Sequence, residues 1–166
     1  VRLMALTSSF PAVDPRPVAR RALVNSTGLS TGSGYSPNAQ LGNAFAFTGA
    51  TRKTGGYGMV TTATIVDKAN VLGAVDLWLF SRSVSPISSN GTTLSFTDSD
   101  LNYYVGTVSF PAPTAMVNNR AIAVPAIGLN YQCQDSTLYG YLCTLTSHNG
   151  FNDPADIVLG LTMYLL

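Results

Sequence analysis

Hydrophobic and polar positions alternate along most of the chain after residue 40. A period of two is typical of β-strands, and no stretch sustains the 3.6-residue period of an amphipathic helix. Turn residues such as Gly55-Gly56 and Asn90-Gly91 separate the alternating runs. We predict strands over residues 44–47, 57–66, 74–80, 103–110, 121–124, 127–133, 138–145 and 156–165, and a single helical turn within 98–103. The spacing predicts an all-β fold, a two-sheet antiparallel sandwich of about eight strands, of which the jelly roll is one form.

The first forty residues differ from the rest. Prolines and glycines among Ser, Thr and Asn exclude a long helix there and leave one short strand, at 22–24. Much of the positive charge also lies in this segment, on Arg2, Arg16, Arg20 and Arg21. We therefore predict an extended basic N-terminal arm over 1–40 and a β-sandwich domain over 41–166, with these arginines as candidate partner-binding residues. A frayed terminus without function is the alternative.

The composition predicts a surface with few charged residues. Only 10% of residues are charged, against about a quarter in typical globular domains, while 46% are hydrophobic. A surface poor in charge promotes association, so we expect an oligomer or an assembly subunit; a surface kept soluble by hydroxyls and amides is the alternative. The net charge of +1 gives no electrostatic footprint for nucleic acid outside the arm.

We recognise no signal peptide and no membrane-spanning segment, and expect a chain that matures in a reducing cytoplasm.

Catalytic chemistry has few candidates. His148 is the only histidine; a triad would need it beside Ser147 or another hydroxyl and an acid such as Asp153 or Asp156, and nothing marks a nucleophile. One histidine and the separated Cys133 and Cys143 do not make a four-ligand metal site. We expect those cysteines to be free thiols, because Cys143 lies several residues beyond the position facing Cys133 if they occupy two arms of a hairpin. We predict no enzyme, no cofactor and no metal.

Two acidic features have alternative interpretations. Asp98 and Asp100 could hold Ca²⁺, but the pattern favours Asp98 as the cap of a short turn. Asp76 lies within a very apolar strand. It either pairs with a basic side chain across a sheet edge or faces solvent beside Trp78 and Phe80; these would then form an aromatic outer face, although a covered face is equally compatible with the alternation.

The order of the segments resembles a family of small structural virion proteins of tailed bacteriophages. The series runs through Ala44-Phe45-Ala46-Phe47, Gly55-Gly56-Tyr57-Gly58, Ile65-Val66-Asp67-Lys68-Ala69, Asp76-Leu77-Trp78-Leu79-Phe80, Pro86, Phe96-Thr97-Asp98-Ser99-Asp100-Leu101, Val105-Gly106-Thr107-Val108-Ser109-Phe110, Leu138-Tyr139-Gly140 and Asp156-Ile157. It covers residues 40 to 166. The resemblance implies a non-catalytic β-sandwich that decorates or cements a phage head.

The expected function is therefore a virion protein on the capsid surface, assembled in the host cytoplasm. It would associate with copies of itself, as a homotrimer, and with the major capsid protein, which the arm clamps by strand addition and arginine contacts. Neither nucleic acid nor membrane is an expected partner. The alternative is a tail or baseplate component, or a carbohydrate-binding sandwich on the virion surface whose stacking residues come from Trp78, Tyr103, Tyr104, Tyr139 and Tyr141.

Overall fold

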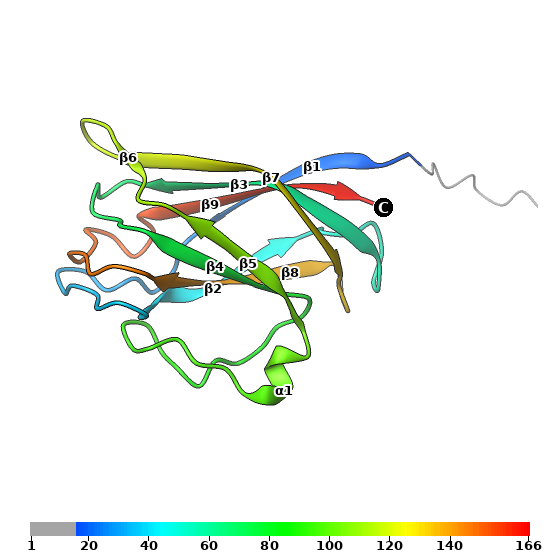
Figure 1. Ribbon diagram of the computed structural model, residues 1–166, viewed down its shortest axis with the longest axis horizontal. Helices are drawn as coiled ribbons and strands as arrows, with labels where there is room; N and C mark the ends of the chain where they lie inside the picture. Colours follow the sequence, from blue (N-terminus) through cyan, green and yellow to red (C-terminus); the bar gives the residue numbers. More distant parts are fainter. Residues whose placement is uncertain (1–15) are drawn as a thin grey trace, which may run out of the picture.

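Two antiparallel β-sheets form the protein, as seen in a computed structural model that describes residues 16–166. The sheets pack face to face as two layers (Figure 1). The elements are β1 (Val18–Asn25), β2 (Gln40–Thr48), β3 (Tyr57–Asp67), β4 (Val75–Phe80), α1 (Asp98–Leu101), β5 (Tyr104–Phe110), β6 (Thr114–Ala115), β7 (Arg120–Gln132), β8 (Thr137–Thr144) and β9 (Ile157–Leu165).

The strand order is that of a jelly roll. One sheet has the order β1-β9-β3-β7-β6 and the other β2-β8-β4-β5. Apart from the two-residue β6, the first strand therefore lies beside the last, and the second beside the last but one, as two interlocked Greek keys require. This confirms the predicted all-β sandwich.

The core lies between the sheets and follows from the alternation along each strand. In β9 every second residue from Ile157 to Leu165 is buried. The four-stranded sheet contributes Phe45 and Phe47 of β2, which are 1% and 0% exposed. Burying a large apolar side chain stabilises the fold by about 1.5–3 kcal/mol, so these inward rows hold the two layers together.

The predicted arm needs correction. Residues 18–25, which the sequence placed in the arm, form β1, and β1 pairs with β9 along its whole length, from Val18↔Leu165 to Asn25↔Val158. Leu29 and Tyr35 are buried in the core. The sequence predicted only a short strand at 22–24, because β1 is an edge strand, exposed at most positions, with Arg20 and Arg21 in its middle. Residues 1–15, including Arg2, lie outside the described part.

One long strand replaces two predicted ones. The sequence suggested separate strands at 121–124 and 127–133 because Pro125 interrupts the run. In the structure β7 continues through it, and the pairing with β3 shifts between Val60 and Thr62. Ala126 and Gly128 have φ of 57° and 66°, a bulge that lets the strand accommodate the proline.

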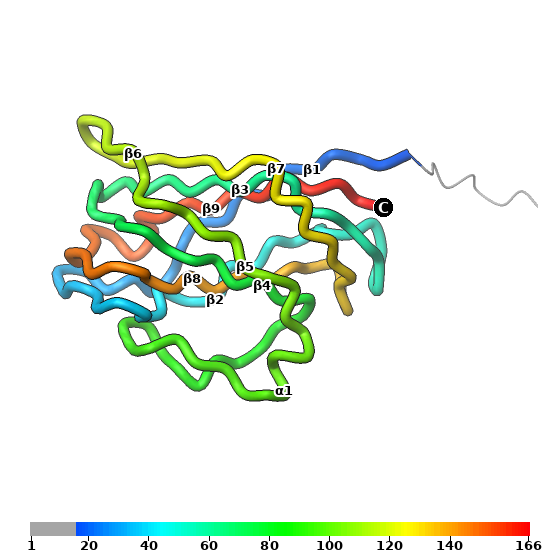
Figure 2. Tube along the Cα trace, in the orientation of Figure 1, coloured from blue at the N-terminus to red at the C-terminus, as the bar shows by residue number. Residues whose placement is uncertain are grey.

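The segment 81–103 joins β4 to β5 and lies beneath the four-stranded sheet in the view of Figure 2. It ends in α1, a single helical turn. Thr97, not the predicted Asp98, is its N-cap: the Thr97 hydroxyl accepts a hydrogen bond from the Asp100 N–H, and the Asp100 carboxylate accepts one from the Thr97 N–H. This reciprocal capping box gives Asp100 a structural role.

Candidate interaction surfaces

The outer face of the five-stranded sheet is almost free of charge. Strand register and burial place a set of side chains on this face in β1, β9, β3 and β7, and Arg21 alone among them is charged. They are Ala19, Arg21, Leu23, Asn25, Val158, Gly160, Thr162, Tyr164, Tyr57, Met59, Thr62, Thr64, Val66, Ala121, Ala123, Pro125, Asn130 and Gln132. We call this the neutral face. Leu23 and Tyr164 are 59% and 42% exposed on it, and exposed apolar side chains grouped on a sheet are typical of contact surfaces.

The described arginines of the predicted binding set do not lie on a free arm. Arg20 and Arg21 are neighbours in β1 and point to opposite sides: Arg21 lies on the neutral face, while the Arg20 guanidinium lies against Gly49 at the end of β2. The Arg16 carbonyl, just before β1, accepts a hydrogen bond from the Arg52 guanidinium. The structure thus places the Arg20 and Arg21 side chains on opposite sides of the sheet, and the role of these arginines as partner contacts stays a prediction.

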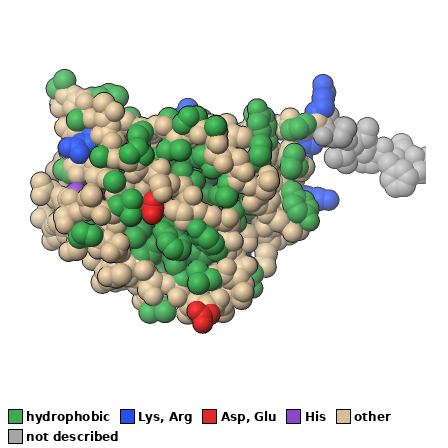
Figure 3. Space-filling model, viewed as in Figure 1, with side chains coloured by type: hydrophobic (Ala, Val, Ile, Leu, Met, Phe, Trp, Pro, Cys, Tyr) green, Lys and Arg blue, Asp and Glu red, His purple; other side chains and the backbone are tan. Residues whose placement is uncertain are grey.

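Charge is sparse elsewhere too. In Figure 3 hydrophobic side chains are spread over the visible face of the molecule, with few charged ones among them. Two exposed hydrophobic residues, Met116 and Val117, form the tip of the β6–β7 hairpin and are 56% and 91% exposed. This hairpin projects beyond the rest of the sandwich (Figure 1).

The outer face of the four-stranded sheet is aromatic and largely covered. Phe80 and Tyr141 are buried beneath the segment 81–103, and Trp78 and Tyr139 pack at their side. Of the five aromatics proposed for sugar stacking, Tyr141 is therefore unavailable: it is 2% exposed and its hydroxyl donates to the Val84 carbonyl. Trp78 and Tyr104 remain half-buried or exposed at the rim, with ring centroids 5.4 Å apart.

Asp76 lies on this same outer face. Its cross-strand neighbours are Cys143 of β8 and Ser109 of β5. One of its carboxylate oxygens, Oδ1, is buried without a hydrogen-bond partner, and so is Nε1 of Trp78. Buried polar atoms without partners are rare in native proteins, so these two atoms mark an unusual site in the described chain.

The His148 ring is packed between two aromatic side chains and has no catalytic partners beside it in the described chain. Its ring packs between Tyr35 and Phe151, at centroid distances of 5.2 and 5.4 Å, and its Nδ1 lies 3.0 Å from the Asn149 carbonyl oxygen. The two acids considered as its partners serve the turn before β9: Asp156 accepts from the Asn152 and Asp153 N–H groups, and Asp153 accepts from the Ala155 N–H. No triad is assembled within residues 16–166.

Stability should depend on pH through His148. Burial lowers the pKa of this imidazole below its ordinary value of 6.5, against a smaller opposing effect of the Asn149 carbonyl and Asp67. The unfolded chain then binds a proton more readily than the folded one, so stability falls as pH drops below 6.5. The slope should reach at most about 1.4 kcal/mol per pH unit, the limit for one proton. Urea unfolding between pH 7 and 5.5 measures it, and His148→Asn should flatten the curve; an unchanged slope in that variant would contradict the assignment.

Both cysteines are buried and free. The hairpin considered for them is not formed, because β7 and β8 belong to different sheets. Burial raises the pKa of Cys133 to about 12 and also raises that of Cys143, so both thiols stay protonated and unreactive. Within the described chain no cluster of His, Cys, Asp or Glu is placed to hold a metal ion, and no helix is long and apolar enough to span a membrane.

No protein-family model matches the chain, and no curated protein matches it. Solved structures similar to it include the vertex protein P5 of PRD1, at 16% identity and a TM-score of 0.39 over 89% of this chain and 96% of that one. Turnip yellow mosaic virus follows with 13% identity and a TM-score of 0.31 over 99% and 89%. Infectious bursal disease virus, strain Gx, has 11% identity and a TM-score of 0.34 over 100% and 41%. Likenesses this distant carry no conclusion about what the chain does.

Proposed function

We propose that the protein is a structural component of a tailed-phage virion that decorates or cements the capsid. It associates with copies of itself and clamps neighbouring subunits of the major capsid protein. Assembly takes place in the host cytoplasm, and the protein performs no catalysis.

The neutral face carries this proposal. On this face Arg21 is the single charged residue, and Leu23 and Tyr164 are among the exposed ones. Removing such a face from water therefore costs little free energy of desolvation. Desolvating charged side chains is what makes most protein surfaces poor interfaces. Copies arranged on a shell could bury such a face at every contact, and repetition of weak contacts within one oligomer would raise the overall affinity.

Two further features support it. The ordered segment series over residues 40 to 166 resembles small virion proteins of tailed phages. In addition, β1 is the end strand of its sheet, and an edge strand offers unpaired backbone groups to a partner strand.

Deleting residues 1–15 tests the arm. We expect the shortened chain to keep its unfolding midpoint, because β1 begins at Val18, and to lose attachment to heads prepared without the protein. Deletion to residue 35 is unsuitable, because it removes β1 together with the buried Leu29 and Tyr35. Cosedimentation of full-length and shortened chains with such heads gives the answer. Equal binding would show that attachment does not depend on the arm, while binding by neither chain would count against the proposed function itself.

A further inference from the structure

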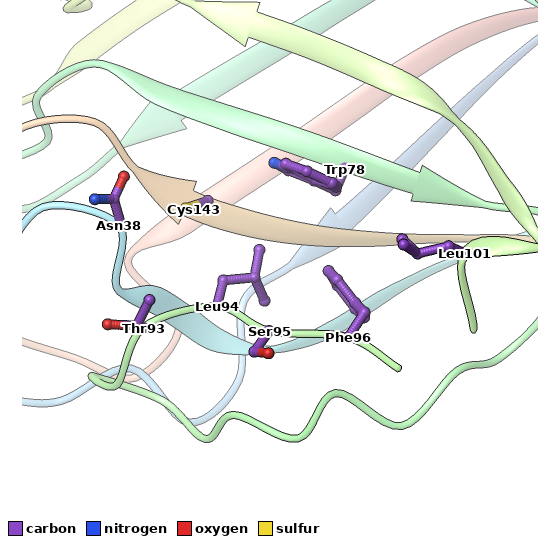
Figure 4. A pocket seen from close by; sticks show the side chains of 8 residues that line it. All are labelled: Asn38, Trp78, Thr93, Leu94, Ser95, Phe96, Leu101 and Cys143. Carbon is purple, nitrogen blue, oxygen red and sulfur yellow. The ribbon is translucent and has the colours of Figure 1, made fainter. Parts of the chain in front are cut away.

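A pocket of about 430 Å³ lies between the outer face of the four-stranded sheet and the segment 81–103. Figure 4 shows Trp78 on one side, Leu94 and Phe96 on the facing segment, and Asn38 and Thr93 toward one end. Its size falls within the range of small-molecule sites, which combine an apolar lining with a few polar groups.

The aromatic wall is held in place by the protein itself. Trp78 stacks with Phe96 at a centroid distance of 6.1 Å and an interplanar angle of 29°. Phe96 in turn packs at 4.6 Å from Phe80 and 5.3 Å from Tyr141, which is anchored through its hydroxyl to Val84. The aromatic rings that line the pocket are therefore held in position before binding, which reduces the entropy lost when they contact a ligand.

Uncommitted polar groups surround this wall. Asn38, Thr93 and Ser95 line the pocket, and within residues 16–166 their side chains form no hydrogen bond. Asp76 lies directly across from the pocket residue Cys143, with its Oδ1 unpartnered, and Nε1 of Trp78 is unpartnered as well. Since both of these atoms are covered, a ligand that reaches them must shift the adjacent side chains.

The chemistry of these groups defines a class of ligand. The carboxylate only accepts hydrogen bonds, the indole N–H only donates, and the amide and hydroxyls do both. A hydroxyl group satisfies each of them, because it donates and accepts. Neither Lys nor Arg is found among the lining residues of the described chain, so an anionic ligand has no counter-charge there. The part of the Trp78 indole that lines the pocket, beside its contacts with Phe96 and Tyr104, suits the apolar C–H face of a sugar ring.

We propose that this pocket binds a neutral saccharide. The ring packs against Trp78, its hydroxyls bond to Asn38, Thr93 and Ser95, and one hydroxyl donates to the carboxylate of Asp76. This site is independent of attachment to a capsid, because it lies on the sheet opposite the neutral face.

Tryptophan fluorescence tests the proposal directly, because Trp78 is the only tryptophan of the chain. The full-length protein is titrated with methyl glucoside, methyl mannoside, methyl galactoside, N-acetylglucosamine and maltose, and with glucose 6-phosphate as the anionic counterpart. We expect a saturable change in emission with at least one neutral saccharide and none with the phosphate. No change with any neutral saccharide, or a response to the phosphate alone, would overturn the proposal.

Matched substitutions locate the binding. Asp76→Asn replaces a charge-assisted hydrogen bond by a neutral one and should weaken binding about tenfold, whereas Asp98→Asn on the exposed turn α1 should leave it unchanged. Ser95→Ala is a second test on an exposed loop residue that cannot disturb the core; it should weaken binding more modestly. Affinity unaltered in both Asp76→Asn and Ser95→Ala would place the saccharide elsewhere and refute the assignment. Thermal unfolding of each variant confirms that it is folded.

Discussion

Replacing Asp67 by alanine should lower the free energy of unfolding by about 4 kcal/mol. Asp67 is 0% exposed, at the end of β3. Its Oδ1 accepts a hydrogen bond from the Ala69 N–H at 2.8 Å, and its Oδ2 accepts from the Val71 and Leu72 N–H groups, both at 2.6 Å. Alanine would leave these three donors without their partner where water cannot easily replace it. Because a domain of this kind is stable by only about 5–15 kcal/mol, the loss should be plain in urea unfolding.

Two matched variants separate the hydrogen bonds from the charge. Asp67→Asn keeps the shape but turns one acceptor into a donor that faces backbone N–H groups, so its loss should lie between that of alanine and the wild type. Asp98→Ala removes an aspartate that is exposed on α1 and should change stability by less than about 0.5 kcal/mol. An Asp67→Ala chain as stable as Asp98→Ala would show that the turn after β3 does not depend on the carboxylate.

A charge placed on the neutral face should prevent assembly without unfolding the chain. In Leu23→Asp the carboxylate replaces a 59% exposed leucine that packs over Gly160, and we expect a loss of about 1 kcal/mol of stability at most. Burying that carboxylate unpaired in an interface costs far more, so attachment to heads should weaken by at least about a hundredfold. Cosedimentation at several protein concentrations measures the change.

Ile87→Asp is the matched control. Ile87 is 69% exposed and belongs to the segment 81–103, which covers the other sheet. Like Leu23→Asp, this variant replaces an exposed aliphatic side chain by a carboxylate, but it does so away from the neutral face. The Ile87→Asp protein should therefore bind heads like the wild type. The reverse result, with Ile87→Asp defective and Leu23→Asp normal, would move the contact surface to the four-stranded sheet.

The fold could be predicted because most strands show a clear alternation of hydrophobic and polar residues. In β4 and β9 every second side chain is buried in the core, which is the pattern that the alternation of hydrophobic and polar residues encodes. A strand at the edge of a sheet shows this alternation less clearly. Most residues of β1 are exposed, so the sequence predicts only its short stretch 22–24. The rest of the strand depends on pairing with β9, which lies more than a hundred residues away in the chain.

The surfaces were predictable only in part. Low charge pointed to an associating protein, but the neutral face requires the register of β1, β9, β3 and β7, which a single sequence does not give. The sequence shows Asp76 as a carboxylate within a very apolar strand and Trp78 as a candidate stacking residue. Asn38, Thr93 and Ser95 were missed, because Asn38 is far from the other two in the chain and no sequence pattern shows that these loop residues meet around one pocket.

The measurement that tests the account most directly is the stoichiometry of the full-length protein on phage heads prepared without it. Light scattering coupled to size exclusion first gives the oligomeric state of the free chain, and heads are then titrated to saturation. The account predicts a discrete oligomer that saturates the heads at a fixed number of copies per capsomer. A monomer that fails to bind heads at any concentration would contradict it.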